Sequence, residues 1–524
     1  MKTGIVLSLS LLVLGSSAAF AQRTELGSID FDTSGSSAAQ PHFIEGVKAL
    51  HSFQWTEAAI SFRKAKEIDP TFAMAYWGEA MSHNHPLWAQ QDMGAAKGIL
   101  ESLSPTLSGR LQLAPMEKEK AWLSTIDVLY YTPGDKLTRD IAYSDAMADM
   151  YERWPDDDEV ATFYALSLLG TVRPGDRGFR RQAQAASIAM PIFERNPDHP
   201  GAAHFTIHSF DDPDHAILAL PHALAYAEVA PMAAHALHMP SHIFLQLGMW
   251  ERVVNSNIDA YASAMRVVNE LGAAEGGEDF HTLSWLAYGY LMLGETARAE
   301  QQLGHAKDAV DRNPRNPRVM NGYLQMRARH ILESGATPEI ALAPAGEAEG
   351  DNDSWVSMVG MVAARRGDID TARSAANRIT AMREAIGGDG TSFAEQRLAT
   401  LENEIRALAL ASQGRFEAAI EHSQSAVNSE LAVGAPSGPP NPIKPALELH
   451  AEILLQAGRA DEAVDAYQRS LQWIPQRPAS LIGLARAAQQ AGQQQLARQT
   501  YQALVDMPGA NLSSDLFAEA HAAL

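Results

Sequence analysis

The ten residues GRADEAVDAY at positions 458–467 return as GQQQLARQTY at positions 492–501, and this repetition decides the fold. Gly458, Ala463 and Tyr467 each recur 34 residues later in the second copy. A period of 34 residues with a glycine at an internal turn is typical of a unit made of two antiparallel helices. In such a unit the small alanine lets the helices approach closely, and the aromatic ring fills the space beside it.

The same unit can be found along most of the chain. Near the start it reads Ala58-x3-Phe62-x2-Ala65-x4-Pro70, and glycine–alanine pairs with the same spacing occur at Gly294…Ala299, Gly367…Ala372 and Gly414…Ala419. Helical periodicity continues almost to the end, without the alternation that is typical of strands. The sequence therefore predicts an all-α solenoid in which each repeat buries its apolar face on its neighbours.

These motifs resemble those of the tetratricopeptide-repeat (TPR) family. The resemblance implies a right-handed superhelix whose first helices line a concave groove, where such proteins hold their ligands. The segments HALHMPSHIF at 235–244 and NHPLW at 84–88 also resemble an uncharacterised group of exported bacterial TPR proteins. That second resemblance implies no particular activity.

The first 21 residues have the features of a secretory signal peptide. Lys2 precedes an apolar run from Ile5 to Leu14, and Ala19-Phe20-Ala21 supplies the small-x-small pattern of a cleavage site. No later segment approaches 18 uninterrupted apolar residues, so we expect no membrane span. The mature protein is expected to be periplasmic or secreted.

Composition shifts divide the rest of the chain. Residues 22–41 are expected to form a disordered leader, and residues 42–430 a TPR-like solenoid with a histidine-lined groove. The segment 431–445, rich in Gly and Pro, resembles a linker. Residues 446–524 would then form a separable C-terminal block of TPR repeats.

The charge and the cysteine content narrow the range of functions. The chain has 41 Lys and Arg against 63 Asp and Glu, a formal net charge of −22 that disfavours nucleic acids and anionic membranes as partners. It has no cysteine, which excludes disulfides and thiolate metal sites. Any metal would have to be held by nitrogen and oxygen ligands.

Histidine is concentrated in one segment, since eight of the 18 histidines fall between His199 and His242. A His-x3-His pair occurs there twice, one repeat length of 34 residues apart, at His204/His208 and His238/His242. Because equivalent positions of stacked repeats lie side by side, these four imidazoles are expected to converge. His235 and His281 each stand thirteen residues before a turn glycine, Gly248 or Gly294, and are expected to join them.

This arrangement predicts a transition-metal site. Residues four apart on a helix share one face, with Cβ atoms about 5–6 Å apart, which suits imidazoles on one metal or on adjacent metals. Imidazole ligands without thiolates favour copper or zinc first, with iron possible. The paired motifs resemble the dicopper sites of tyrosinase-like proteins in spacing alone. The predicted ligands are His204, His208, His235, His238, His242 and His281.

Several nearby residues have more than one interpretation. Asp211, Asp212, Glu275, Glu278 and Asp279 are candidates either for direct ligands or for partners that orient the imidazoles. Pro213-Asp214 is an ordinary turn sequence. Pro240 is expected to kink the helix over 235–247 between His238 and His242. His51, His83 and His85 would reach the site only if the superhelix curls back on itself.

Familiar catalytic signatures are missing, including His-Glu-x-x-His, Gly-x-Ser-x-Gly, the phosphate-binding loop and a dinucleotide fingerprint. If a coordination position is open, oxygen activation or metal-assisted hydrolysis is possible. The main alternative is a non-enzymatic scaffold whose groove binds a periplasmic protein or peptide. In that case the histidines would be hydrogen-bonding or pH-responsive groups. A purely structural metal is a third possibility.

Overall fold

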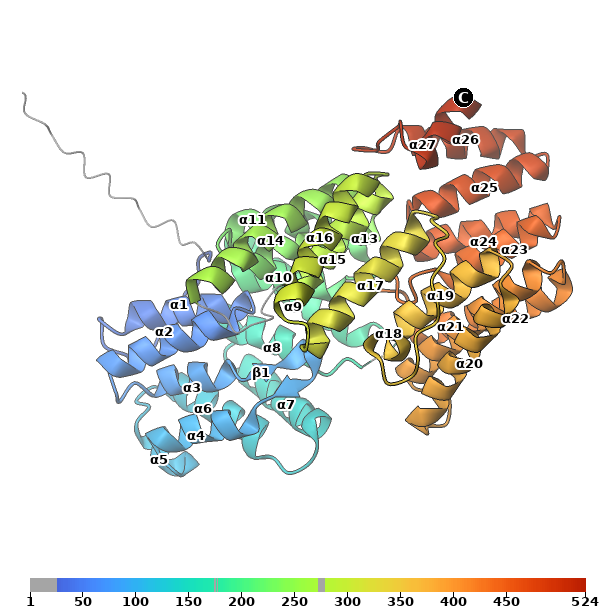
Figure 1. Cartoon of the computed structure of the whole chain (residues 1–524). Helices are drawn as coiled ribbons and strands as arrows, with labels where there is room; N and C mark the ends of the chain where they lie inside the picture. Colours follow the sequence, from blue (N-terminus) through green and yellow to red (C-terminus); the bar gives the residue numbers. More distant parts are fainter. Residues whose placement is uncertain (1–25, 174–175, 177, 272–278) are drawn as a thin grey trace, which may run out of the picture.

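The computed structural model describes residues 26–173, 176, 178–271 and 279–524, which form a continuous array of antiparallel helices (Figure 1). The predicted signal peptide lies outside the described residues. The strands found in the described part are β1 (Asn84–His85) and β2 (Gln90–Gln91), which form one short antiparallel pair. The prediction of an all-α solenoid is confirmed.

The helices follow one another in antiparallel pairs from the N-terminal end of the array to the C-terminal end (Figure 1). The N-terminal helices are α1 (Gln40–His51), α2 (Trp55–Ile68), α3 (Ala73–Met81), η1 (Pro86–Trp88), α4 (Met93–Leu103), α5 (Leu107–Gln112), α6 (Glu117–Tyr131), α7 (Lys136–Arg153) and α8 (Asp158–Gly170). The central helices are α9 (Arg180–Arg195), α10 (Pro200–Ser209), α11 (Ala216–Val229), α12 (Ala234–His238), α13 (Pro240–Gln246), α14 (Trp250–Leu271), α15 (Phe280–Met292), α16 (Thr296–Arg312) and α17 (Pro317–Glu333). The C-terminal helices are α18 (Ala348–Asp351), α19 (Asp353–Arg365), α20 (Ile369–Ile386), α21 (Phe393–Ala411), α22 (Phe416–Val433), α23 (Ala446–Gln456), α24 (Ala460–Trp473), α25 (Pro478–Gln490), α26 (Gln494–Val505) and α27 (Asp515–Ala523).

The repeated glycines form the turns inside the helix pairs. Gly458 has φ +78° and Gly492 has φ +77°, a left-handed conformation that strains residues with a β-carbon. The next amide after each glycine returns to the preceding helix, as in the 2.9 Å bond from Arg459 N to the carbonyl oxygen of Leu454. The 34-residue period is therefore a period of helix ends.

The repeated alanine and tyrosine form the contact between paired helices. Ala463 is fully buried and Tyr467 is 2% exposed. Tyr467 lies over Gly483 of α25, where an added β-carbon would be 2.2 Å from the tyrosine ring. A small residue on one helix therefore makes room for the aromatic ring of the other, as the sequence predicts.

The leader differs from the expectation of disorder over its described part. Leu26 and Phe31 are buried, and the Phe31 ring contacts Phe43 of α1 at a centroid distance of 5.1 Å. Ser34 donates to the carboxylate of Glu119 from both its amide (2.7 Å) and its hydroxyl (2.8 Å). Two apolar residues separated by polar ones are enough to hold this segment against the array, although they give no periodic signal.

The C-terminal repeats also differ from the expectation of a separable block. Trp250 of α14 donates from Nε1 to the carbonyl oxygen of Gln476 at 2.8 Å, and the amide of Asn511 donates to the carbonyl oxygen of Leu293 at 2.8 Å. One continuous hydrophobic core contains Trp250 and Leu293 together with Phe517. The last repeats therefore pack back against the central helices.

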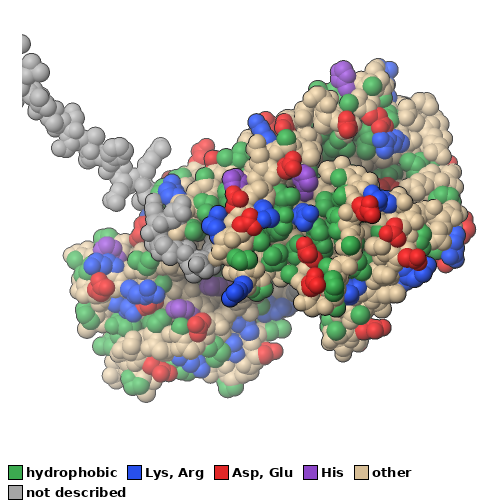
Figure 2. All heavy atoms as spheres, viewed as in Figure 1, with side chains coloured by type: hydrophobic (Ala, Val, Ile, Leu, Met, Phe, Trp, Pro, Cys, Tyr) green, Lys and Arg blue, Asp and Glu red, His purple; other side chains and the backbone are tan. Residues whose placement is uncertain are grey.

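The surface mixes charges of both signs. Figure 2 shows basic and acidic side chains close together over the face in view, so the acidic excess is dispersed there. Within the described ranges, no helix is both long enough and apolar enough to cross a membrane.

Candidate metal centre

The structure brings the six predicted histidines together from four helices. His204 and His208 lie on α10, His235 and His238 on α12, His242 on α13 and His281 on α15. They form two groups, which we name the first triad (His204, His208, His235) and the second triad (His238, His242, His281). In each triad, one nitrogen from every ring lies within 4.8 Å of the other two.

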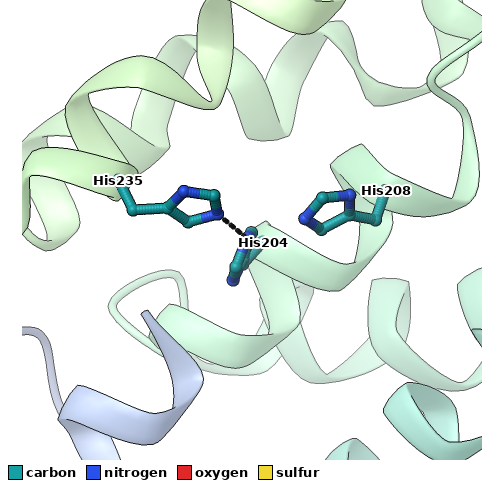
Figure 3. A group of neighbouring side chains, drawn as sticks. All are labelled: His204, His208 and His235. Carbon is teal, nitrogen blue, oxygen red and sulfur yellow. Dashed lines mark hydrogen bonds between the residues drawn. The ribbon is translucent and has the colours of Figure 1, made fainter. Parts of the chain in front are cut away.

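The rings of the first triad point toward one another across the gap between α10 and α12 (Figure 3). The Nε2 atoms of His204 and His235 are 3.0 Å apart. His204 donates from Nδ1 to the backbone carbonyl oxygen of His51 at 2.6 Å, so its Nε2 carries a lone pair. His208 Nε2 is buried and has no hydrogen-bond partner in the described part of the chain.

The second triad is centred on His238. Its Nε2 lies 3.1 Å from Nε2 of His242 and 2.9 Å from Nε2 of His281. His238 is 2% exposed and His242 is 9% exposed, while His281 lies at the surface. Three ring nitrogens therefore converge on one point that can be reached from the side of His281.

Hydrogen bonds on the far side of the rings fix the tautomers of His238 and His242. His238 Nδ1 lies 2.7 Å from Asn257 Oδ1, and the Asn257 amide nitrogen donates to the carbonyl oxygen of Val253 at 2.7 Å, which identifies Oδ1 as the acceptor. His242 Nδ1 lies 2.7 Å from a carboxylate oxygen of Asp211. Both rings therefore donate from Nδ1 when neutral.

The two Nε2 atoms that face each other at 3.1 Å are consequently both acceptors. Two lone pairs in contact repel, and a buried pair of unsatisfied acceptors is costly. A cation between them would remove the conflict. The outward hydrogen bonds to a carboxylate and to an amide are those with which proteins orient metal-binding imidazoles.

A third group of three residues has a different character. His51, Glu159 and His199 are at most 1% exposed, and Glu159 accepts from Nε2 of His51 at 2.7 Å and from Nε2 of His199 at 3.1 Å. His199 Nδ1 accepts from the amide of Ala202, so its Nε2 carries the proton. The donors and acceptors of this group match, and it is complete without an ion.

The two triads touch each other. The ring centroids of His208 and His242 are 6.3 Å apart, and those of His235 and His238 are 6.5 Å apart. Two metal ions held by the triads would therefore be neighbours.

Burial keeps these imidazoles neutral. It lowers the pKa of His204, His208, His235 and His238 well below the usual range, and the neighbouring imidazoles lower each pKa further. Neutral imidazole is the form that binds metals, since protonation uses the lone pair.

Pro240 separates the two ligand-bearing helices α12 and α13, as its position in the sequence predicts. Proline lacks an amide hydrogen, so the regular helical hydrogen bonding is interrupted between His238 and His242. The two rings meet edge to face, with centroids 5.0 Å apart and planes at 84°.

Both triads open into one cavity of about 810 Å³. Its wall includes His208 and His235 from the first triad, and His242 and His281 from the second. The opposite wall is residues 433–441, so the segment expected to be a linker covers the site. Gln246 Nε2 donates to the carbonyl oxygen of Pro436 in this segment at 2.8 Å.

The nearby carboxylates have separate roles. Asp211 orients His242, whereas Asp212 stabilises the turn by accepting from the amides of Asp214 and His215. Asp279 caps α15 by accepting from the amide of Thr282 at 3.1 Å. Glu275 and Glu278 lie outside the described residues.

The remaining N-terminal histidines do not enter either triad. His51 contributes its backbone carbonyl, and the His85 ring stacks on Trp55 with centroids 4.6 Å apart. The neighbouring Trp88 does reach the site, where it lines the cavity. Sequence reasoning missed Glu159, His199, Asn257 and Trp285, whose partners are distant in sequence and leave no spacing signal.

Comparison with known proteins identifies the repeat. Residues 454–507 match the model of the tetratricopeptide repeat, so the chain contains TPR repeats, as the 34-residue spacing predicts. Such repeats indicate a protein-interaction scaffold. A search of curated proteins finds no match.

Solved structures of low similarity align along most of the chain. The TPR domain of P58(IPK) is 14% identical over 87% of this chain and 99% of its own, with a TM-score of 0.23. The APC/C hetero-tetramer Cut9-Hcn1 gives 13% identity over 92% and 96%, with a TM-score of 0.31. The human IFIT1 dimer with m7Gppp-AAAA gives 12% identity over 91% of both chains, with a TM-score of 0.30.

Proposed function

We propose that this TPR protein binds two neighbouring copper ions, one in each histidine triad, and acts on a small molecule that enters the adjoining cavity. The observation that carries the proposal is the 3.1 Å approach of Nε2 of His238 to Nε2 of His242. Both rings donate from Nδ1 to other partners, so only a cation between the Nε2 atoms makes this contact favourable.

Copper is favoured over zinc by charge. The ligands are neutral imidazoles, and the carboxylate in contact with them, Asp211, touches only the outer nitrogen of His242. Two adjacent divalent ions repel each other about four times as strongly as two monovalent ions at the same distance. Copper can be bound as Cu(I), which halves each charge, and it accepts imidazole ligands readily.

A catalytic role is supported by the opening of both triads into the cavity. A structural metal is usually enclosed by four protein ligands, whereas a catalytic one keeps a position open. Three histidines per ion leave such a position, and four of the six rings line the cavity. Copper would supply one-electron redox chemistry there, while the protein orients the ligands and limits the access of water.

Metal analysis of single variants tests the proposal. Inductively coupled plasma mass spectrometry of the untagged chain should give two equivalents of copper. His204→Ala and His238→Ala should each remove one equivalent, and the double variant should remove both. His222→Ala and His450→Ala are matched controls, because these histidines are also buried but lie outside the triads.

Each result has a defined meaning. Two equivalents of zinc would reject copper but keep the dinuclear site. Metal that persists in the double variant would reject the ligand assignment. Absence of metal from the wild type after reconstitution with Cu(I) would reject the function and favour the scaffold.

The second candidate is a protein-binding scaffold, which the TPR match over residues 454–507 supports. These repeats lie beyond the segment that covers the cavity, so protein binding there and metal binding are compatible. Cross-linking to a defined partner, lost when residues 454–507 are altered and unchanged in the histidine variants, would establish it.

Export is a further part of the proposal. It rests on the signal-peptide pattern of residues 1–21. Mass spectrometry of the N-terminus of protein recovered from periplasm should find Gln22 as the first residue. Full-length protein confined to the cytoplasm would contradict export.

A further inference from the structure

The cavity beside the triads contains a charged donor without a partner. Arg329 of α17 lines the cavity and is 5% exposed. Its Nη2 donates to the carbonyl oxygen of Pro440 at 2.6 Å, but its Nη1 has no hydrogen-bond partner among the described residues. A buried guanidinium nitrogen without an acceptor costs stability, so its retention needs a reason.

The nearby acidic group does not satisfy this nitrogen. Glu333 lies one turn further along α17, and its carboxylate accepts from Arg477 Nη2 at 2.7 Å. No hydrogen bond joins Glu333 to Arg329 in the described structure, where Glu333 Oε1 is itself unpartnered. The Arg329 guanidinium instead lies 5.1 Å from the centre of the Tyr288 ring, which supports it from a face that has no lone-pair acceptor.

A second unpartnered donor lines the same cavity. Trp473 of α24 has a buried Nε1 that makes no hydrogen bond in the described part of the chain. Indole nitrogen is a donor only. Two side chains of the lining, one of them charged, therefore offer N–H groups for which the protein supplies no acceptor.

The carboxylates of the lining are already in use. Asp211 is held by His242 and Gln246. Both oxygens of Glu430 accept from the amide of Ala446 at 3.1 Å, and burial raises the pKa of Glu430 to about 7, which reduces its negative charge near neutrality. Neither group leaves Arg329 without a net positive field.

The rest of the wall is aromatic and apolar. Trp285 contacts the ring of His242 with centroids 4.4 Å apart, and Trp88, Phe393 and Trp473 also line the cavity. Flat rings of this kind favour an aromatic or similarly planar ligand.

We propose that the cavity binds a small aromatic carboxylate, whose carboxylate group accepts from Arg329 Nη1 and whose ring lies among the tryptophan side chains beside the triads. The proposal rests on the proposed function, since it names the class of substrate that the same site would receive. Guanidinium–carboxylate pairing would satisfy the donor that the protein leaves open.

Binding of benzoate to the full chain tests this inference. Titration by isothermal calorimetry should show saturable binding of benzoate and about tenfold or weaker binding of benzamide, which has the same ring but no charge. Arg329→Gln should weaken benzoate binding by about tenfold or more, the usual effect of losing a charged hydrogen-bond partner. Arg327→Gln is the matched control, because Arg327 is on the same helix and contacts Trp355, outside the cavity lining.

Trp473→Phe provides a second variant, should Arg329→Gln fail to fold by circular dichroism. It removes one neutral donor and keeps an aromatic ring, so benzoate affinity should fall by about fivefold. Benzoate that fails to bind, that binds no better than benzamide, or that binds Arg329→Gln and Trp473→Phe as well as the wild type overturns the inference.

The metal content of the same samples keeps the two proposals distinct. Two equivalents of copper without benzoate binding would reject the substrate class and leave the dinuclear site. Benzoate binding that depends on Arg329 in protein without metal would support the anion site and reject the metal centre.

Discussion

His204 donates from Nδ1 to the backbone carbonyl oxygen of His51 at 2.6 Å, which joins two residues 153 positions apart. This bond fixes the tautomer of a proposed metal ligand through a helix that carries none of the six predicted ligands. The His51 ring is in turn held by Glu159. The first triad therefore depends on the packing of α1 against α8 and α10.

Glu159→Gln should lower the free energy of unfolding by about 3 kcal/mol at pH 7, because two buried imidazoles lose an ionic acceptor. Burial alone would raise the pKa of Glu159, but His51 and His199 hold it down at about 2, below the ordinary 4.5. A lowered pKa in the folded state gives stability that is present above pH 4.5 and is lost as the pH falls toward 2. Urea denaturation between pH 3 and pH 7 should therefore show a smaller pH dependence in the variant.

Glu404→Gln is the control for this measurement, with the opposite sign. Glu404 is fully buried with both carboxylate oxygens unpartnered, and burial raises its pKa well above 4.5. A raised pKa means that the wild type loses stability as the pH rises above 4.5. The variant should therefore be at least as stable as the wild type at pH 7. Equal losses in both variants would contradict the assignment of Glu159.

Asp211→Asn should weaken the second metal equivalent by about 10- to 100-fold, the usual effect of removing a group that orients a metal-binding histidine. The carboxylate can only accept from His242 Nδ1, whereas an amide can also donate to it and so allow the wrong tautomer. Competition with a copper chelator measures the change. Asp212→Asn, one residue away but bonded to His215, should leave the affinity unaltered.

Removal of the metal should lower the melting temperature. A ligand present at about 100 times its dissociation constant stabilises the folded state by about 2.7 kcal/mol. Differential scanning calorimetry with and without chelator should show this loss in the wild type. In the His204→Ala/His238→Ala double variant the chelator should have no effect, and a similar loss there would mean that the metal is bound elsewhere.

Gly483→Ala should destabilise the C-terminal repeats by about 1–3 kcal/mol, because the new β-carbon would lie 2.2 Å from the ring of Tyr467. Gly304→Ala makes the same change inside α16, where the β-carbon would meet nothing within 4 Å. That variant should be more stable by about 0.5–1 kcal/mol, the helix preference of alanine over glycine. Thermal denaturation followed by circular dichroism distinguishes the two outcomes.

The sequence allowed the fold and the grouping of the histidines to be predicted for one reason. A repeat places equivalent residues side by side, so the offset of 34 between His204 and His238 was already a statement about space. The division into two triads could not be read in this way, because His235 joins the helix before its own, and His281 the helix after. Pro240 signalled a kink but not its direction.

Contacts between distant parts of the chain left no such signal. Asn257 is an ordinary polar residue of α14 until its amide is seen to bond Val253 and to accept from His238. Residues 434–441 have the composition of a linker, since Gly and Pro serve equally well in a connection and in a wall that passes close to Trp285. Gly438 shows the second use, because a β-carbon there would lie 2.6 Å from that ring.

The return of the last repeats onto the central helices has a consequence for how the molecule unfolds. An open solenoid is stabilised by nearest neighbours, so its ends can fray while the middle persists. Here Trp250 is bonded to Gln476, 226 residues away, and Gln246 to Pro436, 190 residues away. Breaking the interface of one repeat therefore strains contacts across the whole array. We expect a single cooperative transition with slow folding, since many of its contacts are distant in sequence.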